Sequence, residues 1–387
     1  MKIALLSSLL LFVSSTALAY PEFIGYGYSS CLTCHVNGMG SGPLNDYGRA
    51  LWSAEIASRA LYPNSMSNED IANQSGFFIK PDLLPTWIRP HIKYRDISIT
   101  QNLKSAEETR SYFRMQRDIG MTSSDEMGKY LATVTFSPLQ ETREPTDVYK
   151  AREYYIRLEP VQTWWLYVGL MEKVFGLRTI DHSSYQRSPQ GFNPVLNSPS
   201  GNQDSQGVVL HKIEEKWEVA LNAFTGNPYE EEQYRQKGFS GLTEFEVGEN
   251  KRLGLSALGS KGDLSKNDMY ALHYRQGLGE GSAFLFEYGY LQEQDLTTES
   301  PVIKGSYNYL QTNWLLTRGY FFKTQIERYN REFKASSPDT WRWRLGLLAF
   351  PLPRFEFRVD VINQRSFSES PVLNDGWSYQ GQLHVSL

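Results

Sequence analysis

Two cysteines and a histidine lie together near the start of the chain, in the run Cys31-Leu32-Thr33-Cys34-His35. The sequence has no other cysteine. In an oxidising compartment this pair could form a short disulfide, supply half of a zinc site or form two thioether bonds to a haem. The next histidine, His91, is too distant for a local zinc site, and a thioredoxin-like βαβ context is absent. A histidine directly after the second cysteine is placed to ligate haem iron. The run therefore predicts one covalently attached haem c.

The motif does not identify the second axial ligand of the predicted haem iron. Met66 is the tentative choice, because it follows a predicted helix and can return to the far face of the haem. His91 would give a bis-histidine site of lower potential. Met39 lies four residues after His35, a reach of about 14 Å that makes wrapping round the haem strained. A five-coordinate or water-ligated iron is a further alternative.

Arg49 is the residue near the motif whose side chain suits a haem propionate, since a guanidinium matches carboxylate geometry. An exposed surface arginine is the alternative. Tyr47 and Trp52 are expected to pack against the haem or a neighbouring wall. The remaining histidines, His182, His211, His273 and His384, are too scattered in the sequence to predict a metal site.

The elements that position the motif differ along the chain. Residues 1–19 combine Lys2, a short apolar stretch and a small-residue cleavage site ending at Ala19, as in a secretory signal peptide. Residues 20–76 are expected to form a monohaem segment, with a helix from Pro43 to Leu61 stopped by Pro63 and a second short helix near Ser67. About forty residues are too few to bury a haem and a core, so this segment needs a partner structure.

From about residue 77 to 387, apolar and polar residues alternate with a period of two residues. In Phe355–Val361, apolar residues alternate strictly with Glu356, Arg358 and Asp360. A soluble sandwich would turn the apolar face inward, whereas a membrane barrel turns it toward lipid. Long strands, aromatic apolar faces and charges recurring in mid-strand favour the barrel. We predict about sixteen strands, an even number, near 85–99, 110–122, 128–139, 148–159, 162–173, 206–215, 216–225, 239–248, 251–260, 267–277, 281–293, 305–317, 319–333, 340–351, 353–364 and 376–387.

The predicted fold is thus mainly β: a transmembrane antiparallel barrel with the haem segment as a lumen plug. The longest connection, near 180–206, is expected to be an extracellular loop or one folded into the lumen. The polar strand faces should line the lumen, with these charges forming a satisfied interior: Lys323, Glu327, Arg354, Glu356, Arg358 and Asp360.

Composition excludes other classes of protein. The chain carries 39 basic and 43 acidic residues, a net charge of −4 that gives no electrostatic case for nucleic-acid binding. After the signal, no apolar run approaches the length of a membrane-spanning helix. No nucleophile triad, phosphate loop or metal-carboxylate cluster is evident, so bond-making catalysis has no sequence support.

The N-terminal residues resemble those of the fused monohaem cytochrome–porin family of outer-membrane iron-oxidising cytochromes. The resemblance rests on Pro21 and Phe23, the run Cys31–His35, Pro43-Leu44 and Tyr47-Gly48-Arg49, while the barrel matches only in kind. It implies a haem segment plugging a barrel and passing electrons across the outer membrane, in the best-known members from extracellular Fe(II). The insert Gly38–Gly42 departs from their pattern.

The expected function is electron transfer between an extracellular donor or acceptor, Fe(II) among the candidates, and a periplasmic cytochrome or another soluble electron carrier. Outer-membrane lipid is the other expected partner, in the outer membrane of a Gram-negative bacterium. Moving electrons through an apolar band about 25 Å tall requires a redox centre within it. Two alternatives are a haem-bearing diffusion porin and a periplasmic cytochrome fused to a soluble β-domain.

The ligand prediction can be tested on purified protein by a haem stain and a redox titration. We expect the wild type to stain, and Met66→Ala to change both the absorption spectrum and the midpoint potential, because a thioether ligand raises the potential. An unchanged spectrum and potential in Met66→Ala would remove Met66 as the ligand.

Overall fold

The computed structural model describes residues 21–28, 31–38, 43–74, 85, 87–103, 107–138, 149–177, 204–334, 339–367 and 375–386. The predicted signal peptide, Met39, His182 and the long connection up to residue 203 lie outside these ranges. Among the described residues, no helix is both long and apolar enough to cross a membrane.

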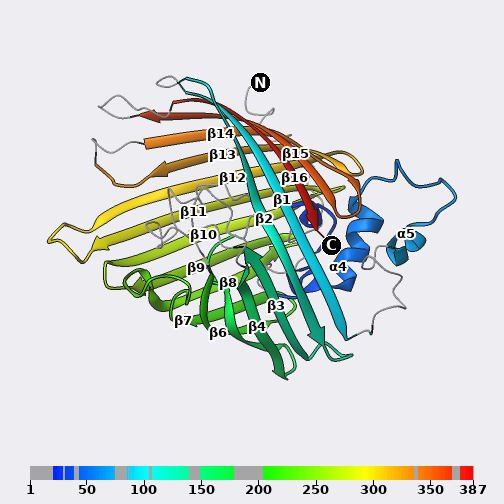
Figure 1. The fold of residues 1–387 in the computed structure, drawn as a ribbon, viewed down its shortest axis with the longest axis horizontal. Coiled ribbons are helices and arrows are strands. Elements are labelled where there is room, and N and C mark those ends of the chain that lie inside the picture. The colour runs from blue at the N-terminus through cyan, green and yellow to red at the C-terminus, as the bar shows by residue number, and fades with distance from the viewer. Residues whose placement is uncertain are drawn as a thin grey trace, which may run out of the picture.

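Sixteen antiparallel strands form one closed barrel, as predicted (Figure 1). Each strand pairs with its sequence neighbours, and β1 pairs with β16 from Lys93↔Ser386 to Leu103↔Gly376, which leaves no open sheet edge. The strands are β1 Ile88–Leu103, β2 Thr109–Ser124, β3 Tyr130–Pro138, β4 Tyr149–Val161, β5 Trp164–Glu172, β6 Asp204–Ile213, β7 Trp217–Phe224, β8 Lys237–Gly248, β9 Lys251–Lys261, β10 Ser265–Gly279, β11 Ser282–Asp295, β12 Ile303–Thr317, β13 Tyr320–Asn330, β14 Asp339–Leu352, β15 Phe355–Phe367 and β16 Gly376–Ser386.

The barrel turns its polar face inward, which rules out a soluble sandwich. In β15, Glu356 and Arg358 are 1% and 5% exposed, whereas Phe357 and Val359 are 46% and 58% exposed. The β-branched and aromatic residues of these strands suit a pleated wall, and their outward position suits a lipid environment.

Charges inside the barrel are paired within a strand or across neighbouring strands. Arg358 donates to Asp360 at 2.6 Å, and Arg342 donates to Glu327. His384 Nδ1 lies 2.9 Å from Glu356 Oε2. The prediction of a satisfied polar interior is therefore confirmed for Glu327 and Glu356, whereas Asp360 Oδ1 is buried without a hydrogen-bond partner among the described residues. Pairing is what makes buried charges tolerable. The prediction was wrong for Arg354, which lies in the turn between β14 and β15 and not on the lumen face of a strand.

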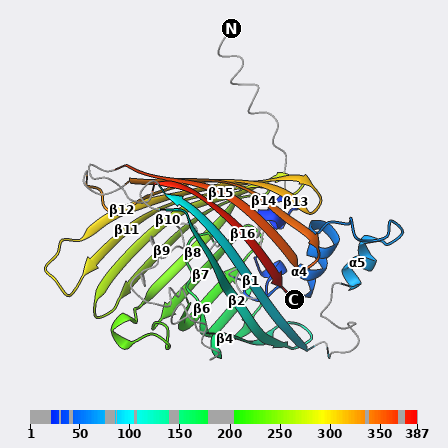
Figure 2. The ribbon, with the colours of Figure 1, turned by 45° about the horizontal axis from the view of Figure 1, so that its top comes forward.

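The two ends of the barrel differ. At one end most connections between strands are tight, such as 162–163, 249–250, 280–281, 318–319 and 353–354. At the other end most connections are longer. The N-terminal helices lie at the end with the tight turns (Figures 1 and 2). They are α2 Pro21–Gly25, α3 Cys31–Cys34, α4 Asp46–Leu51, the π-helical turn η2 Trp52–Ile56 and α5 Asn68–Gln74; a short 3₁₀ turn, η4 Glu232–Tyr234, follows β7.

The helix predicted from Pro43 to Leu61 is shorter than expected. It begins at Asp46, widens into the π-helical turn η2 and ends at Ile56. It ends there because Ala57 adopts an extended conformation and the backbone N–H of Ser58 donates to Phe350 O at 2.8 Å. The second predicted helix is present as α5. Ser67 caps it, since the Asp70 N–H donates to Ser67 Oγ at 3.0 Å and the Asp70 carboxylate accepts from the Ser67 N–H.

The chain leaving β5 crosses the lumen. Val174 and Leu177 are buried, the Gly176 N–H donates to Ser256 Oγ at 3.0 Å, and the Leu177 N–H donates to Glu287. Leu177 belongs to the same apolar cluster as Ile24 of α2. The described residues after β5 thus fold into the lumen, whereas the connection predicted near 180–206 lies outside the described residues as far as residue 203.

A charge on the outer wall should destabilise the barrel. Leu345, in the middle of β14, is 50% exposed on the outer face. We expect Leu345→Arg to lower the free energy of unfolding in lipid vesicles by about 2–4 kcal/mol, measured by urea titration. Leu345→Phe is the apolar control. Equal stability of the Arg and Phe variants would show that this face does not contact lipid.

Candidate functional site: the Cys31–His35 segment at the mouth of the barrel

One helical turn carries the predicted haem attachment. In α3, the His35 N–H donates to Cys31 O at 2.8 Å. The two thiols are not joined as a disulfide; Cys34 is fully buried and Cys31 is half-buried. His35 follows at 5% exposed. The structure thus keeps the three residues together on a single turn, as thioether attachment and iron ligation by the adjacent imidazole require.

A short backbone pairing then holds His35 and its neighbours against the next helix. The Val36 N–H donates to Pro43 O at 3.0 Å, and the Asn45 N–H donates to Cys34 O at 2.9 Å. Glycine is required at position 48, because a Cβ there would lie 2.3 Å from Cys34 O. The Tyr47-Gly48-Arg49 motif therefore has a packing reason: it lets α4 approach the attachment turn.

Asn45 is a site residue that the sequence reasoning missed. Its side-chain oxygen accepts from the Gly48 N–H at 2.8 Å and caps α4, while its amide donates to Thr33 O at 3.0 Å and Leu32 O at 3.2 Å. An asparagine just before a helical pattern is a recognised N-cap signal, but its second set of bonds, to the attachment turn, follows only from the fold.

The attachment segment enters the lumen. Arg157 on β4 donates to Val36 O at 2.8 Å, and the Gly38 N–H donates to Tyr167 OH on β5 at 3.2 Å. Val36 packs in a cluster with lumen residues of β3 to β7, Leu131, Tyr155, Tyr167, Val209 and Ala220 among them. On the other side, Arg275 of β10 donates to the sulfur of Cys31. The barrel wall therefore surrounds the residues that the sequence singled out.

His211 on β6 lies beside this segment, and the sequence gave no reason to select it. Its side chain is fully buried, and a Cβ on Gly38 would lie 3.0 Å from its Nδ1. Neither ring nitrogen has a hydrogen-bond partner among the described residues; Glu218 lies 3.7 Å from Nε2. Such an imidazole is unusual, because buried polar atoms are nearly always hydrogen-bonded.

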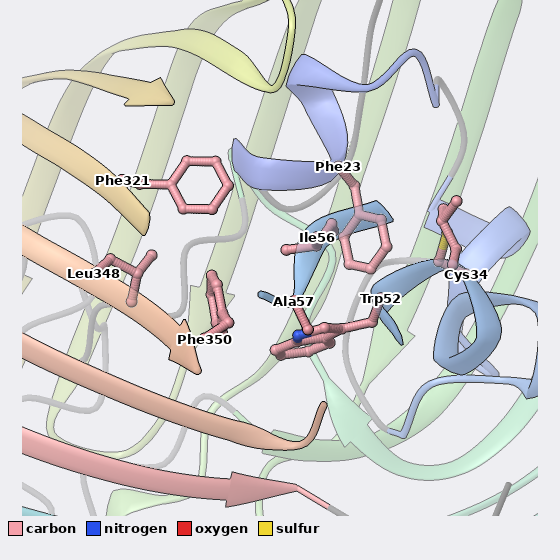
Figure 3. Packing of buried hydrophobic residues seen from close by; sticks show 9 residues of the cluster. Phe23, Cys34, Trp52, Ile56, Ala57, Phe321, Leu348 and Phe350 are labelled. Carbon is pink, nitrogen blue, oxygen red and sulfur yellow. The ribbon is translucent and has the colours of Figure 1, made fainter. Parts of the chain in front are cut away.

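Apolar packing fixes the rest of the segment to the wall. Trp52 packs edge-on against Phe23 at 6.1 Å and against Phe350 of β14 at 5.1 Å between ring centroids. Figure 3 shows the side chains of Phe321 and Phe350 extending from the strands toward the helices that carry Cys34 and Trp52. The core of the segment is thus completed by the barrel, as expected for a chain too short to form its own.

Arg318, in the turn between β12 and β13, binds three groups of the segment. Its guanidinium donates to Ala57 O at 2.8 Å, Ser53 O at 3.0 Å and Asn68 Oδ1 at 2.9 Å. The first two carbonyls lie at the end of η2, where helical carbonyls lack internal partners. Arg318 therefore docks the segment to the rim of the barrel.

A pocket opens between α4, η2 and the barrel rim, next to the ligand residue. Its walls are Pro43, Leu44, Arg49, Trp52, Ser53, Arg354 and Ser386. Leu44 pairs with His35 in a β-bridge, so the pocket begins beside the predicted ligand. Its walls combine apolar side chains with two guanidiniums, but Cys31, Cys34 and His35 are not among them, and the cavity is much smaller than a porphyrin.

Arg49 lies in this pocket, as its predicted contact with a propionate requires. Its Nε donates to Leu44 O at 3.1 Å. Burial lowers the pKa of Arg49 to about 9; the carboxylate of Asp46 acts in the opposite direction, and the nearby charges of Arg354 and Arg89 lower the pKa further. A buried cation beside other cations favours an anionic ligand.

The two proposed alternatives for the second axial ligand lie in different places. Met66 is half-buried before α5; its N–H donates to Pro63 O at 3.0 Å, and its carbonyl accepts from Arg59. His91 is on the lumen face of β1, 2% exposed, with Nε2 2.9 Å from Thr135 Oγ1. Both remain predictions.

Comparison with known proteins identifies the fold. No protein-family model matches the sequence, and no curated protein matches it. Among solved structures, OmpT of Vibrio cholerae has a TM-score of 0.59 at 9% identity, covering 79% of this chain and 99% of that one. An anion-selective porin of Comamonas acidovorans has a TM-score of 0.59 at 10% identity, covering 78% and 99%. The outer-membrane channel DcaP of Acinetobacter baumannii gives 0.58 at 9% identity, covering 78% and 97%. The fold is that of the outer-membrane porins.

Removal of the docking arginine should loosen the segment. In Arg318→Ala, the loss of three charge-assisted hydrogen bonds should cost about 3 kcal/mol of docking free energy, so amides of residues 53–68 should exchange with deuterium roughly 100-fold faster. Arg331→Ala, which removes a pair with Glu293 at the opposite end of the barrel, is the control. Equal protection in both variants would contradict the docking role.

Proposed function

We propose that this protein is an outer-membrane c-type cytochrome–porin fusion that transfers electrons between the cell exterior and periplasmic carriers. Cys31 and Cys34 would hold one haem by thioether bonds, with His35 as its proximal ligand. The attached haem supplies a one-electron Fe(III)/Fe(II) couple. The protein's own residues hold that group, exclude water from it and fix its position in the barrel.

The observation that carries this proposal is the place of the attachment turn. Cys34 is fully buried and His35 is 5% exposed, and much of this shelter comes from barrel residues. A haem motif on a free tether would have no reason to be packed in this way. A segment with too little chain for its own core instead uses the wall and turns of the barrel as the second half of its pocket.

Two described parts of the chain lie within the lumen. The attachment segment fills it near the tight-turn end, and residues 173–177 cross it from β5. The two meet where Ile24 and Leu177 share one apolar cluster. These segments narrow the lumen, which speaks against a wide channel for solutes.

The difference between the two ends of the barrel indicates which electron carrier approaches each end. Outer-membrane barrels have short periplasmic turns and longer extracellular loops. The haem segment lies at the tight-turn end, with α4 and α5 outside the wall (Figures 1 and 2). A periplasmic cytochrome would therefore approach this end. A small extracellular donor, Fe(II) among the candidates, would reach the site from the long-loop end, through a lumen lined by polar side chains.

A diffusion porin whose haem segment is structural is the second candidate. The observation in its favour is the fold, which the chain shares with an anion-selective porin and an outer-membrane channel. The polar lumen is also typical of channels. The two functions differ in what crosses the membrane, solute or electrons, so one reconstitution experiment separates them.

In liposomes that enclose a reducible dye, we expect wild-type protein to reduce the dye when an impermeant donor is added outside. The double variant Cys31→Ser/Cys34→Ser should insert but transfer no electrons, because it cannot attach haem. Flux of a small sugar into the same vesicles is measured in parallel. If the wild type allows sugar flux but does not reduce the dye, the result contradicts the electron-conduit proposal and supports the diffusion-porin function.

A further inference from the structure

The outer wall of the barrel carries charged side chains where β1 and β2 pair. Asp96 of β1 lies opposite Arg114 of β2, and Arg117 follows further along β2. Their strand neighbours Arg95 and Asp118 are 4% and 3% exposed and belong to the lumen face, so Asp96 and Arg117 face outward. Residues paired across a ladder share a face, which places Arg114 outside as well. The outer wall therefore holds one carboxylate and two guanidiniums at this place.

The strands before β1 in the closed sheet have a different outer face at the same rows of the ladder. Figure 1 shows β16, β1 and β2 side by side on one side of the barrel. The rows that contain Asp96 and Ser98 continue through apolar residues and one glycine on β16, β15 and β14: Leu383, Phe357 and Ala349 in the first row, and Gly381, Val359 and Leu347 in the second. The outer face thus changes from apolar to polar where β16 meets β1.

These charges lie at the depth of the hydrocarbon and not at its edge. Arg117 is seven residues from the end of β2 at Ser124, on the tight-turn side. A tilted strand needs about 9–11 residues to cross the hydrocarbon. Toward the long-loop side, Trp343 and Trp377 lie 6.4 Å apart between ring centroids, as in the aromatic girdle of a membrane barrel. A charged side chain that faces lipid at this depth is costly, and intramembrane charges are almost always paired within protein.

One copy of the barrel satisfies this polar face only in part. The phenols of Tyr94 and Tyr112 donate to the Asp96 carboxylate. Arg117 is half-buried and has no hydrogen bond or ion pair in the described part of the chain. Next to these groups the wall is low: Ser98 is exposed, and a Cβ on Gly381, its partner in register, would meet nothing within 4 Å. Small residues on a membrane-facing surface let two proteins approach closely.

We propose that the outer face of β16, β1 and β2 is the contact surface between two copies of this chain in the membrane. Acyl chains accept no hydrogen bond from a guanidinium, so Arg117 needs an acceptor that another protein supplies. A second copy related by an axis along the membrane normal presents the same residues at the same depth. The guanidiniums of one copy then lie opposite a face that carries a carboxylate and the hydroxyls of Ser98 and Thr100.

The second copy is favoured over an unrelated partner because this face is complementary to itself. It carries both signs of charge, hydroxyl acceptors and a low strip at Ser98 and Gly381. A surface with donors and acceptors at one depth can pair with its own copy about a two-fold axis. The contact does not involve Cys31 or His35, so it goes beyond the proposed electron transfer and does not depend on it.

The experiment measures the mass of the full-length protein in a mild detergent, by sedimentation and by native mass spectrometry. Arg117→Leu removes the charge and leaves an apolar wall that suits lipid. Gly381→Trp fills the low strip, and it should fold because the position is open. Leu345→Trp, on the outer face of β14, is the matched control. Circular dichroism of each protein shows whether the barrel has formed.

We expect the wild type and Leu345→Trp to form an assembly of at least two copies. Folded Arg117→Leu and Gly381→Trp should associate about tenfold more weakly, as expected for the loss of one charge-assisted hydrogen bond or of close approach. A monomeric wild type would overturn the proposal, whether the face is bare or holds a lipid or another protein. Undiminished association of both variants, or equal weakening in Leu345→Trp, would also overturn it, because the contact would then lie elsewhere on the barrel.

Discussion

The structure depends on one constraint: a backbone that lies in lipid must satisfy its N–H and C=O groups within the protein. The pairing of β1 with β16 meets it by closing the sheet, so no strand edge is left open. Closure of sixteen strands also creates a wide lumen. The inward charges need partners in that lumen, and pairs such as Arg358–Asp360 and His384–Glu356 supply them. The space that remains near the tight turns is where the N-terminal segment fits.

The N-terminal segment and the barrel therefore form one folding unit at the site. The segment is anchored by apolar packing of Trp52 on Phe350 and by the hydrogen bonds that Arg318 donates to backbone carbonyls. Glycine allows the closest contact: a Cβ on Gly25 would lie 1.9 Å from the backbone of Gly281, whose N–H donates to Gly25 O at 3.0 Å. The stability of the segment and the environment of the Cys31–His35 run are then set by the same turns of the barrel.

Much of the barrel could be predicted from the sequence, because long stretches in which apolar and polar residues alternate are compatible with few structures other than β-strands. Strict alternation in Phe355–Val361 indicates both a strand and which face is polar, and the exposed apolar residues confirm that the polar face lines the lumen. Strand ends and the helix near Pro43 were predicted less well. The helix ends early because Ser58 bonds to a strand far away in the sequence, a contact that no local pattern contains.

By itself the sequence determined the elements: a Cys-x-x-Cys-His run, a short helical segment and sixteen alternating strands. Residue type and local spacing carry that information, since thioether chemistry and strand periodicity are properties of neighbouring residues. Only the tertiary structure decided which distant residues meet the N-terminal segment that carries the run. Arg354, His211 and Arg318 reach it from three different strands or turns, and barrel closure, which brings them together, is a property of the whole chain.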